Sequence, residues 1–161
     1  ERCAVVEVKG RHAGYLALYV GLATGATAVL VPETEYNFEE HVADKIRQAR
    51  LGGRTNFMIV VAEGAASAMA VGEEIREKLG LDPRVTILGH IQRGGDPTAK
   101  DRVLATRMGH EAVRVLAEGG TNKVVIDRNN EIIAMDIDEG LSMMKTLNGQ
   151  EFEVMRAMTG Q

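Results

Sequence analysis

Residues 57–96 read FMIVVAEGAASAMAVGEEIREKLGLDPRVTILGHIQRGGD, and this stretch decides the fold. It contains two short runs rich in β-branched residues, Phe57–Ala62 at its start and Arg84–Leu88 near its end, and each run is typical of a buried strand. Between them, apolar residues recur at helical spacing, at Ala68, Val71, Ile75 and Leu79. Gly80 follows as a residue that commonly ends a helix. The order strand, helix, strand predicts a βαβ unit with two parallel strands.

The same alternation extends through the rest of the chain. Further strands are expected at Ala4–Val8, Thr27–Val31, Lys123–Asp127 and Glu131–Met135, the last two around the turn residues Asn129 and Asn130. Further helices are expected at His12–Thr24, from Phe38 after an Asn37 N-cap with Glu40 three residues on, from Asp96-Pro97 to Glu118, and in the tail from Asp138. This pattern predicts an α/β fold, a mostly parallel, Rossmann-like sheet with helices on both faces.

The composition disfavours a nucleic-acid-binding protein. The 161 residues include 19 Lys and Arg against 23 Asp and Glu, a net charge of −4, so a basic duplex-binding surface is not expected. Aromatic residues make up 4% with no Trp, which also disfavours stacking platforms for single strands. The single cysteine, Cys3, excludes an intrachain disulfide and is typical of a reducing, cytoplasmic environment.

One segment has to be weighed as a membrane span. Tyr15–Pro32 is an 18-residue stretch without a charged side chain, which meets the minimum length for a transmembrane helix. Its glycines, threonines and terminal proline interrupt the apolar run, so we interpret it as a buried helix followed by a buried strand. Neither a membrane partner nor a targeting signal is expected.

Polar residues and glycines gather where three of the predicted strands end. These strand exits are Lys9-Gly10-Arg11, Glu63-Gly64, and the run from Gly89 to Asp96 that contains His90 and Arg93. In an open parallel sheet, ligands bind beyond the carboxyl ends of the strands. Arginine donors, glycine amides and the start of the helix after Arg11 suit a phosphate, and the Glu63 carboxylate suits sugar hydroxyls. The exits therefore predict a site for a phosphorylated sugar or a similar polyol.

Each of these signals also has a purely structural interpretation. Gly10-Arg11 is typical of a turn with a solvated arginine, Glu63 can cap the following helix, and a lone histidine such as His90 is commonly structural. The sequence contains no metal-binding cluster, no Walker-type phosphate loop and no nucleophile elbow. Without a resemblance, the pattern predicts an α/β domain with an anion-binding edge.

Several motifs of the chain resemble the bacterial 6-phosphofructokinases. The most specific is RVTILGHIQRGGDPT at 84–98, and the others, in the family's order, are VVEVKGRHAG at 5–14, VPE at 31–33, VAEG at 61–64 and DRVLATR at 101–107. The resemblance spans at least residues 2–128. It implies the phosphofructokinase fold and the family's glycolytic reaction, the transfer of a phosphoryl group from Mg-ATP to the 1-hydroxyl of fructose 6-phosphate.

The resemblance also implies roles for individual residues. His90 and Arg93 would hold the sugar and its 6-phosphate, and Glu63 would accept hydrogen bonds from the sugar hydroxyls. Arg11, with the Gly10 amide, would stabilise charge on the phosphoryl group in flight. Arg2 and Arg84 would reach the substrate phosphate of a neighbouring subunit, which implies a homo-oligomer, in this family a tetramer. The implied substrate-binding set is Arg2, Lys9, Gly10, Arg11, Glu63, Arg84, His90, Ile91, Gln92 and Arg93.

The chain departs from the family pattern at two places. Lys9 stands where the family usually has a methionine packed against the sugar, so it either adds a cation beside the reaction centre or turns toward solvent. At the family's effector site, Gly25 and Arg54 match, Thr27 stands where an acidic residue is common, and Gly52 stands where a lysine is common. The resemblance therefore leaves open whether allosteric control is kept.

The family's ATP loop, magnesium carboxylate and catalytic aspartate have no counterpart in these 161 residues. We therefore expect the substrate-binding half of the enzyme: a sugar-phosphate lobe at 1–93, a segment at 94–140 that completes the nucleotide lobe, and a tail at 141–161, unless all three pack as one domain. Mg²⁺ and ATP would be bound mainly by the other half, no metal site is expected here, and the chain alone would be inactive. Two alternatives stay open: half of a pyrophosphate-dependent phosphofructokinase, and a non-catalytic sugar-phosphate sensor.

Overall fold

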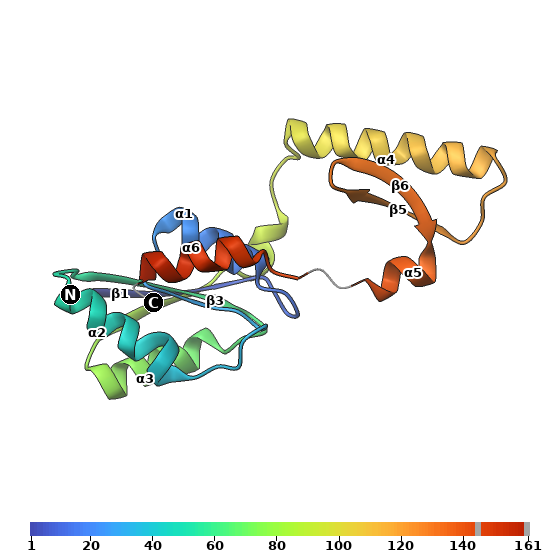
Figure 1. Ribbon diagram of the computed structural model, residues 1–161. Coiled ribbons are helices and arrows are strands. Elements are labelled where there is room, and N and C mark those ends of the chain that lie inside the picture. Colours follow the sequence, from blue (N-terminus) through green and yellow to red (C-terminus); the bar gives the residue numbers. More distant parts are fainter. Residues whose placement is uncertain (144–145, 160–161) are drawn as a thin grey trace. The chain divides into compact units, whose positions relative to one another are not determined.

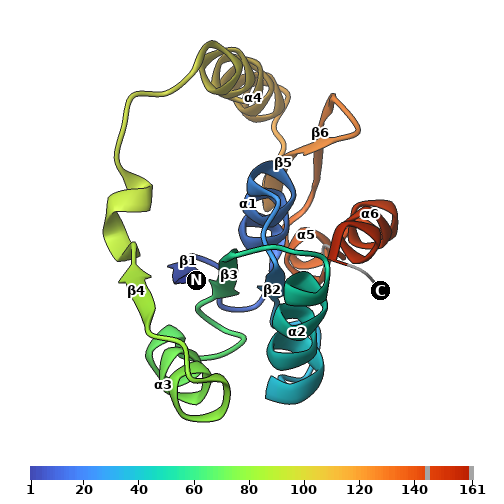
Figure 2. The same ribbon diagram turned by 90° about the vertical axis from the view of Figure 1, so that its left-hand side faces the viewer.

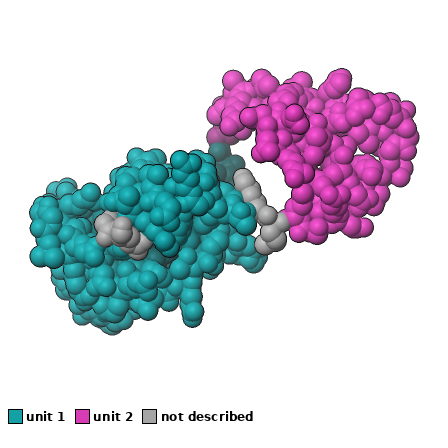
Figure 3. All heavy atoms as spheres, in the orientation of Figure 1, with its two compact units in different colours: residues 1–94, 146–161 teal, residues 95–145 magenta. Residues whose placement is uncertain are grey.

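A computed structural model describes residues 1–143 and 146–159, in which strands and helices alternate (Figure 1). The chain divides into two compact units, residues 1–94 with 146–161 and residues 95–145 (Figure 3). The assignment of segments to enzyme lobes stays a prediction. Residues 144–145 and 160–161 of the predicted 141–161 tail lie outside the described residues.

The first unit is built on a four-stranded parallel sheet in the order β2-β3-β1-β4. Its strands are β1 (Arg2–Val8), β2 (Ala28–Leu30), β3 (Asn56–Ala62) and β4 (Pro83–Ile87). The register pairs Val8 with Ala62 and Glu7 with Ile87, so β1, β3 and β4 end side by side. This confirms the predicted α/β fold with a mostly parallel sheet. We name the side where the strands end the carboxyl edge, and the side where they begin the amino edge.

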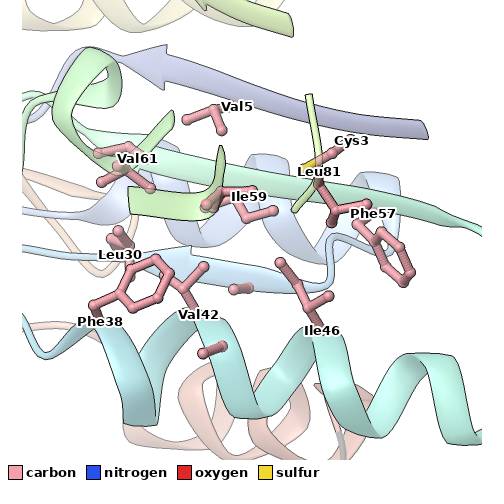
Figure 4. Close-up of a cluster of buried hydrophobic side chains, with 14 of the residues drawn as sticks. Cys3, Val5, Leu30, Phe38, Val42, Ile46, Phe57, Ile59, Val61 and Leu81 are labelled. Atoms are coloured by element: carbon pink, nitrogen blue, oxygen red, sulfur yellow. The ribbon is translucent and has the colours of Figure 1, made fainter. Parts of the chain in front are cut away.

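Helices cover both faces of this sheet, as Figure 2 shows for α1 on one side and for α2 and α3 on the other. The helices are α1 (Tyr15–Thr24), the π-helix η1 (Glu39–Ala43), α2 (Asp44–Leu51), α3 (Ala68–Leu79), the 3₁₀ turn η2 (Gly89–Arg93) and α6 (Gly149–Thr159). Successive residues of a strand point to opposite faces, and both faces of β3 are apolar. Phe57, Ile59 and Val61 pack with η1, α2 and α3 in the cluster of Figure 4, whereas Val60 and Ala62 pack with α1 and α6.

Two helix starts differ from the sequence prediction. The first is α1, which begins at Tyr15 rather than His12, because the chain turns through Gly10 at a φ of 144° and remains a loop up to Gly14. The second is α4 (Ala99–Ala117), which begins at Ala99, so the predicted start at Asp96-Pro97 was wrong. Thr98 caps this helix instead, because its side chain accepts from the Asp101 amide while the Asp101 carboxylate accepts from the Thr98 amide.

The helix expected from Phe38 begins with an unusual turn. The Asn37 side chain accepts a hydrogen bond from the Glu40 amide at 3.2 Å, so Asn37 acts at this end as predicted. The Asn37 amide, however, donates to His41 Nδ1 at 3.2 Å and not to the Glu40 carboxylate. The next residues form the π-helix η1 before the chain continues as α2.

The second unit consists of α4, an antiparallel hairpin and a short helix. The hairpin is formed by β5 (Lys123–Arg128) and β6 (Glu131–Asp136), and α5 (Ile137–Ser142) follows it. Asn129 and Asn130 have φ values of 55° and 68°, as the two central residues of a tight hairpin turn require, which confirms the predicted turn. The helix α4 packs against both strands.

The uncharged stretch Tyr15–Pro32 contains α1 and β2, as predicted. Leu18 of α1 and Leu30 of β2 are buried on opposite faces of the sheet, in two different apolar clusters. Across the described residues, none of the helices combines the length with the apolar composition that crossing a membrane requires.

Candidate active site

Three strand exits come together at the carboxyl edge. Lys9 follows β1, and its Nζ lies 3.4 Å from Glu63 Oε2 at the end of β3. The Lys9 amide donates to Gln92 Oε1 at 3.2 Å, in the turn η2 after β4. Residues that are 54 and 83 positions away from Lys9 in sequence are thus gathered into one polar cluster.

Lys9 itself faces the cluster and not the solvent. Only 21% of its side chain and 28% of the Glu63 side chain are exposed, so the ion pair lies partly below the surface. Of the two orientations that the sequence left open for Lys9, the structure shows the one that adds a cation to the candidate site.

Glycines let the chain segments at this edge approach closely. The Gly64 amide donates to the Gly10 carbonyl at 3.0 Å, and a Cβ atom on Gly64 would overlap the carbonyl of Arg11. At Gly10 the φ of 144° is one that residues with a side chain rarely adopt, and a Cβ would lie 2.6 Å from the Ala13 carbonyl oxygen. Larger residues at either position would push the Arg11 loop away from the end of β3.

The Glu63 carboxylate is held in its charged form. Partial burial alone would raise its pKa, but the hydrogen bond and charge of Lys9, the Gly10 backbone and the charge of Arg11 together lower the pKa below its ordinary value of 4.5. At neutral pH, Glu63 therefore accepts hydrogen bonds through both oxygens, as a ligand rich in hydroxyl groups would require.

Glu33 has a structural role that the sequence reasoning missed. Both of its carboxylate oxygens lie within hydrogen-bond distance of the Gly14 amide, at 2.9 and 3.1 Å. The positive end of α1 therefore faces Glu33, whereas the sequence argument assigned it to a ligand phosphate. The sequence signal for this role was the position of Glu33 directly after the second predicted strand, at an exit that the sequence argument left without a role.

The remaining predicted residues of this edge are exposed. Arg11, His90 and Arg93 are exposed, and within residues 1–143 and 146–159 their side chains make no hydrogen bond or ion pair. Ile91, between them in η2, is 77% exposed. Hydrogen-bond donors on these side chains, which have no partner among the described residues, are available to bind an anion that arrives from solution.

Arg2 and Arg84 lie in the halves of their strands that are nearer the amino edge. Arg2 is the first residue of β1, Arg84 the second of β4, and both are exposed. The six residue steps of β1 from Arg2 to Val8 span about 20 Å. The structure therefore does not bring these two arginines to the carboxyl edge of their own chain.

The three predicted effector residues also lie at the amino edge. Thr27 directly precedes β2, and its hydroxyl accepts from the Met58 amide at 3.2 Å. Thr27 and Arg54 line one hollow of about 170 Å³, together with Lys45, Gln48, Ala49, Gly52 and Met158. Gly25 ends α1 with a φ of 62° and does not line the hollow.

Lys45 is the residue of this hollow that the sequence reasoning missed. It is 6% exposed, and no hydrogen bond or ion pair reaches it within the described part of the chain. Burial lowers its pKa, although Asp44 and Glu40 act in the opposite direction. The signal was its spacing, because Lys45 follows Val42 by three residues and precedes Ala49 by four, on the apolar face of the helix.

The donors at the carboxyl edge do not fit a magnesium site. Glu63 is the one carboxylate in the Lys9 cluster, and it is already ion-paired. Across residues 1–143 and 146–159, no group of three or more His, Cys, Asp or Glu side chains is placed to hold a metal ion. Mg²⁺ prefers several oxygen ligands, so these residues offer it no site of their own.

Comparison with known proteins identifies relatives of the whole chain. The sequence profile described as Phosphofructokinase matches residues 1–116. A relative named ATP-dependent 6-phosphofructokinase, from a Thermoanaerobacter species, is 48% identical over 160 residues, which cover 99% of this chain and 50% of the relative. The chain spans about half the length of the curated relatives that it matches.

Solved structures share the fold. Phosphofructokinase from Saccharomyces cerevisiae matches with a TM-score of 0.80 and 35% identity, over 98% of this chain and 22% of the yeast chain. A pyrophosphate-dependent phosphofructokinase from Marinobacter aquaeolei matches with a TM-score of 0.76 over 92% of this chain and 42% of its own, at 24% identity, which is evidence for the fold alone.

Proposed function

The chain belongs to the phosphofructokinase family, and on that premise we propose that it is the sugar-phosphate-binding half of an ATP-dependent 6-phosphofructokinase. The whole enzyme would transfer the phosphoryl group of ATP to the 1-hydroxyl of fructose 6-phosphate. The observation that carries the proposal is the cluster at the carboxyl edge, where Lys9 is bonded to Glu63 and to Gln92. Arg11, His90 and Arg93 belong to the same strand exits, and their side chains are unpaired among the described residues.

Each residue of the cluster has a proposed role that its environment supports. His90 and Arg93, on the exposed turn η2, hold the 6-phosphate, because their donors have no partner within residues 1–143 and 146–159. Glu63, kept ionised by its surroundings, accepts hydrogen bonds from the sugar hydroxyls. Arg11 and the Gly10 amide stabilise the transferred phosphoryl group. Ile91 and Gln92 position this turn, and Gln92 does so through the Lys9 amide.

Arg2 and Arg84 are proposed to act on a neighbouring subunit. About 20 Å of β1 separates Arg2 from the carboxyl edge of its own chain, and about 10 Å of β4 separates Arg84 from it. Side chains stand roughly perpendicular to the sheet, so neither arginine is directed along its strand toward a phosphate bound there. In a homo-oligomer, proposed to be a tetramer, the amino edge of one subunit would lie beside the carboxyl edge of the next. Each site would then contain residues of two chains.

The phosphoryl donor is proposed to be Mg-ATP. The support is the name of the close relatives, and the carboxyl edge offers Mg²⁺ no ligand set. The nucleotide, the metal and the catalytic base would therefore bind in or belong to the half of the relatives that this chain does not cover. The proposed compartment is the cytoplasm, where ATP-driven sugar phosphorylation takes place.

A second ligand site is proposed at the amino edge, in the hollow of Thr27, Lys45 and Arg54. Among the described residues that line it, Lys45 and Arg54 are basic and none is a carboxylate, so an anionic effector is the ligand that its charge favours. Gly25 ends α1 beside Thr27 and would contribute backbone alone. Allosteric control of the enzyme through this hollow is part of the proposal.

Calorimetric titration with fructose 6-phosphate tests the proposed function. The purified chain should bind the sugar, and His90→Ala or Arg93→Ala should weaken binding by about 1.5–3 kcal/mol, since each removes a charged or hydrogen-bonding partner of a phosphate. Arg76→Ala is the matched control, because Arg76 is exposed and paired with Asp82 away from the cluster. Equal weakening by the control and the two site variants would contradict the assignment, as would kinase turnover by the purified chain with ATP or pyrophosphate.

A further inference from the structure

Lys9 is held at the carboxyl edge by two independent contacts. Its ammonium group pairs with Glu63, and its backbone amide donates to the Gln92 side chain. A lysine on a surface loop ordinarily extends into water, where its charge is best solvated. Here the two contacts fix both ends of the residue, so the position of the charge is a feature of the site.

The ion pair changes the charge balance among the residues of this edge. The edge presents the cations Lys9, Arg11 and Arg93 and two anions, Glu63, which is paired with Lys9, and Glu33, whose carboxylate accepts from the Gly14 amide. Because Glu63 is paired with Lys9, neither arginine forms an ion pair within the described residues, and both present positive charge to a ligand although the charge of Arg11 also acts on Glu63. With a neutral side chain at position 9, Glu63 would offset one of the two arginines.

The two arginines come from different exits. Arg11 follows β1 and Arg93 follows β4, so their donors come from the ends of two neighbouring strands. A phosphate group carries a charge of about −1.5 to −2 at neutral pH and pairs with arginine in a bidentate manner. A sugar with one phosphate satisfies one such arginine, whereas a sugar with a phosphate at each end satisfies both.

We propose that Lys9 is a specificity-determining residue that makes this site prefer a sugar bisphosphate to the corresponding sugar monophosphate. The inference rests on the proposed function and deepens it: the half-enzyme holds the product of phosphoryl transfer more tightly than the sugar substrate. Lys9 acts by cancelling the charge of Glu63, which would otherwise repel the second phosphate, and by lying next to Gly10 and Arg11 in sequence.

Paired titrations of the purified 161-residue chain test the proposal. Fructose 6-phosphate and fructose 1,6-bisphosphate are titrated at one ionic strength into the wild type, Lys9→Met and the charge-retaining control Lys9→Arg. The wild type should bind the bisphosphate more tightly. Lys9→Met should lower the ratio of the two affinities on the order of tenfold, because the lost charge acts on twice as much ligand charge, and Lys9→Arg should keep the ratio.

A second variant, with an expected effect on the bisphosphate preference opposite to that of Lys9→Met, keeps the proposal testable if Lys9→Met does not fold. Glu63→Gln removes the anion that pairs with Lys9, so it should raise the bisphosphate preference, whatever it does to the hydroxyl contacts that both ligands share. A ratio that neither Lys9→Met nor Glu63→Gln changes would overturn this inference and leave the proposed function intact. Failure of the wild type to bind either sugar would overturn the proposed function, and this inference with it.

Discussion

The two edges of one parallel sheet carry charge in opposite ways. At the carboxyl edge, hydrogen bonds from several strand exits hold the backbone, while Arg11, His90 and Arg93 remain exposed and, in the part of the chain that the structure describes, unpaired. At the amino edge, the cation Lys45 is 6% exposed and lines a hollow. The difference shows that an α/β sheet can prepare one end to receive a ligand from solution and enclose a charge at the other.

The largest expected effect separates Arg11 from Arg84 in a complete phosphofructokinase that contains this chain. Arg11→Ala should lower turnover by about 10²–10³-fold with a smaller change in sugar affinity, because its contact strengthens as charge develops on the transferred group. Arg84→Ala should mainly raise the apparent KM for fructose 6-phosphate, because it contacts bound substrate. Steady-state kinetics of the two variants checks the split, and identical effects on both constants would contradict it.

Mixed oligomers sharpen the same comparison. Arg84→Ala and His90→Ala subunits are combined, dissociated and allowed to reassemble. If the amino edge of one chain completes the carboxyl edge of the next, some mixed sites contain an intact His90 and an intact Arg84, and activity partly returns. Absence of recovery after verified reassembly would place Arg84 away from the neighbour's substrate.

The same glycine substitution should have unequal effects at the two edges. Gly64→Ala places a Cβ against the Arg11 carbonyl, so it should cost about 1–3 kcal/mol of stability and also displace the substrate loop. In Gly25→Ala the added Cβ has no atom within 4 Å, so the expected loss of stability, about 1 kcal/mol, comes only from the positive φ. This variant should leave sugar binding unchanged. Denaturant unfolding and sugar titration measure both effects, and loss of sugar binding in Gly25→Ala would break the comparison.

Lys45→Met should stabilise the chain by about 1 kcal/mol at neutral pH, because it keeps the buried stem and removes a charge that forms no ion pair among the described residues. The folded-state pKa of Lys45 is lowered, so the unfolded chain binds the proton more readily. The stability of the wild type relative to Lys45→Met should therefore rise with pH from the lowered pKa up to the ordinary lysine value of 10.5. A pH-independent difference in melting temperature would contradict this prediction.

The smallest expected effect concerns Glu63, whose ion pair with Lys9 is partly exposed. Its pKa is lowered in the folded state, so its contribution to stability is present above the ordinary value of 4.5 and is lost as the pH falls through the folded pKa. The wild type should melt slightly above Glu63→Gln near neutral pH, and the two curves should converge in acid. Parallel curves down to low pH would rule out this contribution.

Local patterns predicted the sheet and the strand exits, because each depends on residues close in sequence. The β-branched runs, the Ala68 stripe and the Asn129-Asn130 turn all form as the sequence indicated. The start of α4 was misplaced at Asp96 because two local capping signals compete there, and the reciprocal Thr98–Asp101 pair satisfies more backbone donors.

Contacts between distant segments were beyond sequence reasoning. The Lys9–Glu63 pair joins residues 54 positions apart, and the Glu33–Gly14 contact depends on how β2 lies relative to the start of α1. Periodicity specifies which face a side chain occupies, but it does not specify the partner that it meets there. The sequence places Lys45 on the apolar face of its helix, and only the packing shows that it forms no ion pair within the described part of the chain.

The loop from Lys9 to Gly14 has a thermodynamic consequence for ligand binding. Gln92 accepts from its first amide, Gly64 donates to its second carbonyl, and Glu33 accepts from its last amide, so three other strand exits restrain it. A ligand therefore meets a loop whose backbone entropy was already lost on folding, and little further ordering opposes binding. The amides of Lys9, Gly14 and Gly64 should exchange slowly with deuterium in the free protein, and ligand binding should slow them little further.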